Sequence, residues 1–248
     1  MTRQTQNAGS RQAGFSMVEL LVAVAILIII MGSVMGQVTA IHKRSQAESS
    51  KLDIIQEARE GMDQLTRDLH QAGYPNRVMY DSTLLTAANW YNDQRVAIRL
   101  VAISPTTIWF EGDVDGRGQV SVVRYRRVTA SAESQRCTNA TPCIERMQSL
   151  KITADPLVGQ PNGPYHILVE NVTNFTITAY DQSGNQIALG AGLTMTANPQ
   201  LLYGTVPTPA NPVIKTIAAT LTVQSPNADL ASKLRPSASV STIVELKN

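Results

Sequence analysis

Residues 13–37 read AGFSMVELLVAVAILIIIMGSVMGQ, an apolar run long enough to cross a lipid bilayer as a single helix. One acidic residue, Glu19, interrupts this run close to its start. A carboxylate in a membrane-spanning helix costs about 2.5–3.5 kcal/mol, so such residues usually have a function. The position of Glu19 therefore calls for a partner that offsets its charge.

Two ordinary interpretations of this segment remain open. In the first, it is a cleavable secretory signal with Arg3 and Arg11 as its basic region, Leu20–Met35 as its apolar region and VTA at 38–40 as the cleavage site. In the second, Phe15–Val38 is an uncleaved signal anchor. Neither interpretation requires an acidic residue within the apolar run.

The sequence GFSMVEL at 14–20 resembles the type III signal of type IV pilins and pseudopilins. The resemblance implies that a prepilin peptidase cleaves after Gly14, removes residues 1–14 as a leader and methylates the new N-terminus, Phe15. It also implies that Glu19 pairs with the N-terminal ammonium of a neighbouring subunit and so sets the register of assembly. Each of these charges is costly at membrane depth unless it meets the other.

Two glycines lie near the end of the apolar run. Gly32 and Gly36 form a small-xxx-small pattern, which allows helices to approach closely. Where major pilins often carry a proline, this sequence has Gly36. The glycines either permit tight packing or local loosening of the helix in a filament, or are simply tolerated there.

An apolar stripe at helical spacing continues beyond the span, and no proline interrupts residues 15–74. We expect one helix, with a transmembrane or filament-core part at 15–38 and an amphipathic part at 39–74 that docks on a globular domain. A free coiled coil is the alternative, but the stripe is too short to favour it. The stripe consists of Ile55, Ala58, Met62, Leu65, Leu69 and Ala72.

The remainder, 75–248, is predicted to be a β-rich globular domain. Two of its runs alternate so that one face is buried, as in an antiparallel sheet that receives the helix stripe. The stretch 181–212 is rich in Gly, Asn and Pro and is expected to be a long surface loop. The predicted strand-forming runs are 95–103, 106–112, 119–128, 166–181 and 213–225.

The two cysteines, Cys137 and Cys143, are close together in the sequence CTNATPC. Outside the inner membrane such a pair would oxidise to a disulfide that closes a small loop. A zinc site is the rival interpretation, and it lacks further ligands nearby. We therefore expect the disulfide.

The segment EGDVDGRGQ at 111–119 offers Asp113 and Asp115 among three glycines, which is a candidate for calcium binding. The position where an EF-hand would carry its bidentate glutamate holds Arg124, which counts against calcium. The alternative is a hairpin turn between two strands, because Asp-Gly is a common turn dipeptide.

Composition and motifs argue against several function classes. The net charge is +2 with scattered basic residues, so a dedicated nucleic-acid surface is not expected. No catalytic, phosphate-binding or metal-binding motif is present, so we expect neither an enzyme nor a cofactor. The basic stretch RYRRV at 124–128 could meet a phosphate or an acidic partner, or could be a strand with Arg124 and Arg126 toward solvent and Tyr125 inward.

Two internal stretches narrow the resemblance. EAREGMDQLTRDLHQAGY at 57–74 and LVENVTNFTITAYDQSGN at 168–185 are similar to segments of PilW-type minor pilins and of J-type minor pseudopilins of type II secretion. The resemblance implies an α+β, pilin-like fold: a long N-terminal helix, transmembrane and then amphipathic, packed on a C-terminal antiparallel β-sheet domain. The implied function is to initiate a type IV pilus or to sit at its tip, in motility or adhesion.

The resemblance also implies partners and a location. The partners would be prepilin peptidase, other minor and major pilins, the inner-membrane pilus assembly platform and a tip adhesin. The chain would cross the inner membrane once with a periplasmic C-terminal domain before assembly, and would lie in the fibre or at its tip afterwards. The rivals are a J-type pseudopilin, a membrane-anchored enzyme or ligand-binding domain, and a tip domain that binds DNA or a surface directly.

Overall fold

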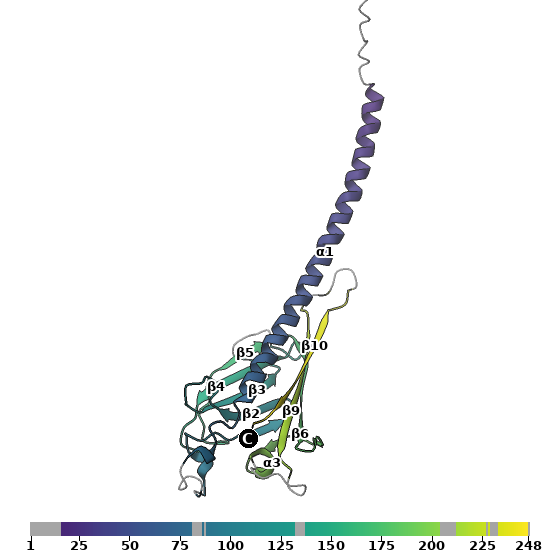
Figure 1. Cartoon of the computed structure of the whole chain (residues 1–248). Helices are drawn as coiled ribbons and strands as arrows, with labels where there is room; N and C mark the ends of the chain where they lie inside the picture. Colours follow the sequence, from purple (N-terminus) through teal and green to yellow (C-terminus); the bar gives the residue numbers. More distant parts are fainter. Residues whose placement is uncertain are drawn as a thin grey trace, which may run out of the picture. The chain divides into compact units, whose positions relative to one another are not determined.

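The chain forms two compact units, Met1–Gln46 and Ala47–Asn248. Helix α1 (Met17–His70) runs through both, and two β-sheets belong to the second unit (Figure 1). The fold is therefore α+β and pilin-like, as the sequence predicts. The computed structural model describes residues 16–80, 86, 88–131, 137–203, 212–226, 228 and 233–247.

Helix α1 ends earlier than residue 74, the limit that the sequence predicts. Its last residue is His70, and Ala72 then forms an antiparallel bridge with Gly112. Gly73 adopts a left-handed conformation with φ of 82°, which glycine tolerates because it has no Cβ. The Gly73 N–H donates to the Glu111 carbonyl oxygen at 2.8 Å, so the backbone leaves the helix by joining a strand.

The amphipathic stripe of α1 is confirmed with one correction. The structure buries Ile54 and leaves the predicted Ile55 only half-buried, because the contact face is rotated slightly from the one inferred. The face also buries Gly61 and Asp68, which the apolar pattern did not select. The buried residues of α1 are Ile54, Ala58, Gly61, Met62, Leu65, Asp68 and Leu69.

The first sheet has six strands, all paired antiparallel, in the order β5-β4-β3-β2-β1-β8. Neighbouring strands β2, β3 and β4 are successive hairpins along the chain (Figure 1). The strands are β1 (Ala102–Ser104), β2 (Thr107–Gly112), β3 (Ser121–Val128), β4 (Cys143–Leu150), β5 (Tyr165–Val169) and β8 (Leu193–Thr194).

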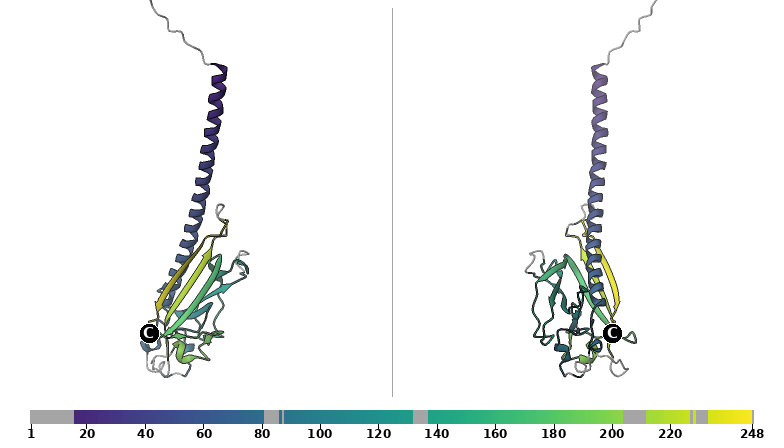
Figure 2. Two further views of the ribbon diagram at one scale, coloured as in Figure 1. Left: turned by 90° about the vertical axis from the view of Figure 1, so that its right-hand side faces the viewer. Right: turned by 60° about the vertical axis from the view of Figure 1, so that its left-hand side comes forward.

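The second sheet has four antiparallel strands in the order β10-β9-β6-β7, and β6, β9 and β10 lie side by side in both views of Figure 2. The predicted alternation is confirmed, because Ile217, Ala219, Leu221 and Val223 are all buried along β9. The strands are β6 (Val172–Asp181), β7 (Gln186–Ile187), β9 (Ile214–Gln224) and β10 (Ser237–Glu245).

The predicted run 166–181 is not one strand but two strands in different sheets. It breaks at Asn171, whose φ of 54° is left-handed and ends the extended path of β5. Asparagine is one of the few non-glycine residues that adopts this conformation readily. The run 95–103 also differs, since its strand, β1, begins only at Ala102. Residues 96–101 are buried before it, and the backbone groups of Ile98 and Val101 form hydrogen bonds with β2 outside any named strand.

Three elements interrupt the stretch 181–212, which the sequence predicted as one long loop. These are β7, β8 and helix α3 (Pro199–Tyr203), while residues 204–211 lie outside the described part. Leu189, Met195 and Leu202 are buried in the core. These apolar side chains, few among many polar ones, anchor the described part of the stretch, 181–203, to the core. Strands β4 and β10 were not predicted, since their sequences are charged or serine-rich.

The part of α1 within the second unit contacts an outer strand of each sheet. Gly61 lies against Val169 of β5, and the Thr66 hydroxyl is 3.1 Å from that of Thr242 in β10. The buried helix residues join those of both sheets in one hydrophobic core, as the stripe predicted.

Two short 3-10 helices, η1 (Arg77–Met79) and η2 (Trp90–Asn92), follow α1.

Candidate functional site

The N-terminal part of α1 exposes an apolar surface. Its large side chains, from Met17 to Ile41, are exposed in the single chain. It belongs to the one helix, among the described residues, that is long and apolar enough to cross a membrane. An apolar surface of this size is not stable in water and requires lipid or other protein chains around it.

Glu19 lies in the first turn of α1 and is exposed. A carboxylate at this end of a helix is favoured by the positive end of the helix dipole. Among the described residues, none forms a hydrogen bond or an ion pair with the Glu19 carboxylate. Gly14 and Phe15, the predicted cleavage and methylation residues, lie outside the described part of the chain.

The two glycines of the apolar helix face open space. A Cβ atom added to Gly32 or Gly36 would meet no atom within 4 Å in the single chain. Neither glycine is therefore required by packing within this chain. The small-xxx-small surface that they form is available to another helix.

The predicted disulfide is confirmed. Cys137 and Cys143 are bonded, with their Cα atoms 5.4 Å apart. Cys143 is the first residue of β4 and is fully buried, whereas the loop between the cysteines is largely exposed. The bond thus fixes a surface loop at the start of a central strand.

The segment with Asp113 and Asp115 is the turn between β2 and β3, which confirms the hairpin interpretation. The Asp113 carboxylate accepts hydrogen bonds from the backbone N–H groups of Arg117 at 3.0 Å and Gly118 at 2.8 Å. In the described ranges, no group of three or more acidic, histidine or cysteine side chains is placed to hold a metal ion. The carboxylate of Asp113 instead closes the turn.

The basic stretch of β3 behaves as an ordinary strand. Tyr125 points inward and is fully buried, as predicted. The Arg124 guanidinium lies 3.5 Å from the centre of the Trp109 ring, while Arg126 forms a 2.8 Å ion pair with Glu145. Both arginine side chains therefore interact with residues of the same chain.

Sequence reasoning missed a polar cluster on the docking face of α1. Asp68, only 2% exposed, accepts hydrogen bonds from the Tyr125 hydroxyl at 2.6 Å and from Arg146 Nε at 2.7 Å. Burial raises the pKa of Tyr125, so its hydroxyl stays protonated and donates. The available signal was the position of Asp68 three residues after Leu65, on the apolar face itself.

A second buried ion pair was also missed. Lys151 Nζ lies 2.6 Å from Glu111 Oε2, and both side chains are fully buried. The ammonium also donates to the carbonyl oxygens of Tyr91 and Val96, each at 2.7 Å. Burial raises the pKa of Glu111 to about 7, against the opposing effect of Lys151, and burial lowers the pKa of Lys151. The pair joins β2 to the end of β4. Nothing in the sequence pattern indicated this ion pair.

Comparison with models of known protein families identifies a motif that includes the first part of the apolar helix. Residues 9–35 match the family model described as the prokaryotic N-terminal methylation motif, which covers well under half of the chain. No curated protein matched the chain. The matched range contains Glu19 and most of the exposed apolar surface. The chain therefore carries the N-terminal signal of a type IV pilin-like or pseudopilin protein, which together with its apolar helix indicates membrane anchoring.

Proposed function

We propose that this chain is a minor pilin that initiates assembly of a type IV pilus or sits at its tip. The observation that carries the proposal is the methylation motif on an exposed apolar helix whose first turn holds Glu19. The N-terminal part of the helix is suited to a bundle with other subunits, because its large apolar side chains from Met17 to Ile41 are exposed in the described part of the chain. The role is assembly rather than catalysis.

In this proposal the Glu19 carboxylate forms an ion pair with the N-terminal ammonium of a neighbouring subunit. Cleavage after Gly14 leaves an ammonium at Phe15, and each isolated charge is costly in an apolar bundle. Pairing the two groups offsets that cost only in one axial register. The partners are prepilin peptidase, the inner-membrane assembly platform, other minor and major pilins, and a tip adhesin.

The first test is the mature N-terminus. The full chain is co-expressed with and without prepilin peptidase, and its N-terminal peptide is analysed by mass spectrometry. We expect N-methylated Phe15 with the peptidase and the uncut chain without it. A chain that begins at Ile41, or that keeps Met1 in both samples, would contradict the proposal.

The second test concerns Glu19. Glu19→Ala should leave cleavage unchanged but greatly reduce incorporation into surface fibres, measured by immunoblotting of sheared pili. Glu48→Ala serves as the control, because Glu48 is an exposed acidic residue of the same helix outside the matched motif. Equal incorporation of both variants would exclude a pairing function for Glu19.

Deletion of the whole chain distinguishes the two kinds of filament. Loss of protein secretion rather than of pili would assign the chain to a type II pseudopilus.

A further inference from the structure

Strand β10 lies at an edge of the four-stranded sheet and pairs, among the described strands, with β9 alone (Figure 2). Its nine residues pair with β9 in one unbroken register. The other edge strands differ, since β7 and β8 have two residues each and β5 pairs across a register shift. Proteins commonly protect sheet edges with short strands, bulges, lysine or proline, because an open edge pairs with other chains. Strand β10 has none of these features.

The hydrogen bonds at the two ends of the β9–β10 pairing show which backbone groups of β10 point away from β9. The Ser225 N–H donates to the Pro236 carbonyl oxygen at 2.7 Å, and the Leu246 N–H donates to that of Lys215 at 2.8 Å. Opposite residues of antiparallel strands alternate between bonded and non-bonded pairs, so the even-numbered residues of β10 bond to β9. The odd-numbered residues turn their N–H and C=O groups outward, and within the described part of the chain these groups have no hydrogen-bond partner. They are Ser237, Ser239, Ser241, Ile243 and Glu245.

The hydrophobic core is incompletely covered at this edge. The inward side chains of β9 are buried, whereas Ala238 and Val240 of β10 pack on the core and remain partly exposed. Helix α1 reaches the same inward row through Thr66, whose hydroxyl is 3.1 Å from that of Thr242, and so contacts the inner face of β10. An added strand would cover Ala238 and Val240 with its own inward side chains, which should therefore be apolar.

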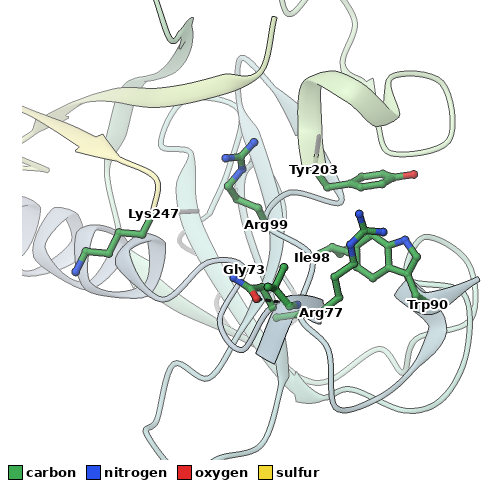
Figure 3. A pocket seen from close by; sticks show the side chains of 10 residues that line it. Gly73, Arg77, Trp90, Ile98, Arg99, Tyr203 and Lys247 are labelled. Atoms are coloured by element: carbon green, nitrogen blue, oxygen red, sulfur yellow. Dashed lines mark hydrogen bonds between the residues drawn. The ribbon is translucent and has the colours of Figure 1, made fainter. Parts of the chain in front are cut away.

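The outward face of β10 is uncharged along most of its length. No side chain of Ser237–Val244 is ionisable, and the hydroxyls of Ser239 and Ser241 meet those of threonines in β9. Charged side chains begin only at the end of the strand, with Glu245 and then Lys247, which lines a cavity of about 310 Å³ (Figure 3). A partner strand should therefore carry small, uncharged side chains on its outward face.

We propose that the outer edge of β10 binds an extended segment of another polypeptide, which joins the sheet as an antiparallel strand. The backbone groups of the five odd-numbered residues would exchange hydrogen bonds with it, and such bonds require an extended backbone. Its side chains would alternate between apolar ones toward the core and small uncharged ones toward solvent. A second copy of β10 suits this edge less well, because its own inward row contains the small Ala238 and the polar Thr242.

The probe is a peptide with the sequence of β9 (Ile214–Gln224), IKTIAATLTVQ, because this sequence already has the required alternation. In the pairing proposed, its odd-numbered residues face the core and its even-numbered residues exchange hydrogen bonds with β10. The fluorescein-labelled peptide is titrated with the full chain in detergent, and its fluorescence anisotropy is measured. Empty detergent micelles serve as the blank.

Two isomers of this peptide, each with three N-methylated amides, separate strand pairing from hydrophobic adsorption. In the first isomer the methyl groups block the edge that would face β10, and in the second they block the opposite edge. We expect the second isomer to bind as the unmodified peptide does, and at least tenfold more tightly than the first. The methylated residues are Ala218, Thr220 and Thr222 in the first isomer and Ala219, Leu221 and Val223 in the second.

Ile243→Pro tests the edge from the side of the protein. Proline removes the outward N–H of residue 243 but leaves the bonds to β9, and edge strands tolerate proline in this orientation. The variant should bind the unmodified peptide several-fold more weakly. Ile243→Thr is the matched control, because threonine is also β-branched and keeps the N–H, and it should bind as the unchanged chain does. Ile243 is 74% exposed, so neither change alters the core.

Absence of binding by the unmodified peptide, or equal affinity of the two isomers, would overturn the proposal. The isomers are compared on the unchanged chain, so this result holds even where Ile243→Pro does not fold. Unchanged binding in a folded Ile243→Pro variant would also overturn it.

A peptide with the sequence of β10 tests the alternative occupant. Tighter binding of this peptide than of the β9 peptide would assign the edge to a second copy of the chain and overturn the proposed partner. All residues of the edge belong to the second unit, so binding should persist in Glu19→Ala. The outcome is thus independent of the pilin assignment.

Discussion

Asp68 of α1 and Tyr125 of β3 are joined by a buried hydrogen bond of 2.6 Å. Arg146 of β4 completes the cluster by donating to the same carboxylate oxygen of Asp68. The helix is thereby attached to two neighbouring central strands by a polar contact within an otherwise apolar interface. Such a contact is satisfied in one helix position only, because a displaced helix would leave a buried charge unpaired.

Asp68→Ala should lower the free energy of unfolding by about 3–5 kcal/mol, because it removes the ion-pair partner of the half-buried Arg146 and the acceptor of the Tyr125 hydroxyl. Tyr125→Phe should cost less, about 1–2 kcal/mol, since the ion pair remains. Urea unfolding of the full chain in detergent, followed by tryptophan fluorescence, measures both. The control is Asp63→Ala on the exposed face of the same helix, where a similar loss would contradict a specific contribution of Asp68.

Gly61→Ala should destabilise the second unit by about 1–3 kcal/mol, because the new methyl group would overlap Val169 Cγ2 where α1 contacts β5. Adding Val169→Ala should remove the overlap, so the double variant should lose less than the sum of the two single losses. Gly36→Ala is the matched control, since its Cβ meets no atom within 4 Å. Strict additivity of Gly61→Ala and Val169→Ala would show that the contact is not tight.

The buried Glu111 predicts a dependence of stability on pH. Its pKa is about 7 in the folded chain against an ordinary value of 4.5, so the folded chain binds more protons than the unfolded chain between these values. The free energy of unfolding should therefore fall as pH rises from about 4.5 to about 7, by up to about 3 kcal/mol. This contribution is fully present below pH 4.5 and is lost above about 7.

The double variant Glu111→Gln with Lys151→Met tests the assignment of that pH dependence. It removes both charges of the buried pair together, which avoids leaving one of them alone. Urea unfolding at half-unit pH steps should give a flatter profile for this variant than for the unchanged chain. An unaltered slope would assign the titration to another group.

The disulfide should contribute about 2 kcal/mol, because a short closed loop removes little entropy from the unfolded chain. Replacement of Cys137 and Cys143 together by serine should therefore leave the chain folded but less stable. A reducing agent should lower the stability of the unchanged chain to that of the variant and leave the variant unaffected. Complete unfolding of the variant would show that the loop is essential to β4.

Local sequence patterns were sufficient to predict those features that depend on one short segment of the chain. The helix, the disulfide, the β2–β3 turn and the inward position of Tyr125 all follow from spacing or from a turn dipeptide. The division of 166–181 into two strands was missed because Asn171 has a left-handed conformation that alternation of apolar residues does not reveal. Strand β10 was missed because its serine and threonine residues pair with those of β9 and bury little surface.

The amino-acid sequence by itself determined the methylation motif, the apolar helix with Glu19 and the α+β class, because these depend on residues that are close along the chain. Only the tertiary structure decided which polar residues are buried. Asp68 meets Arg146 and Lys151 meets Glu111 across long separations in sequence. Periodicity assigns a residue to a face of its own element, whereas such pairings depend on how two sheets and a helix pack together.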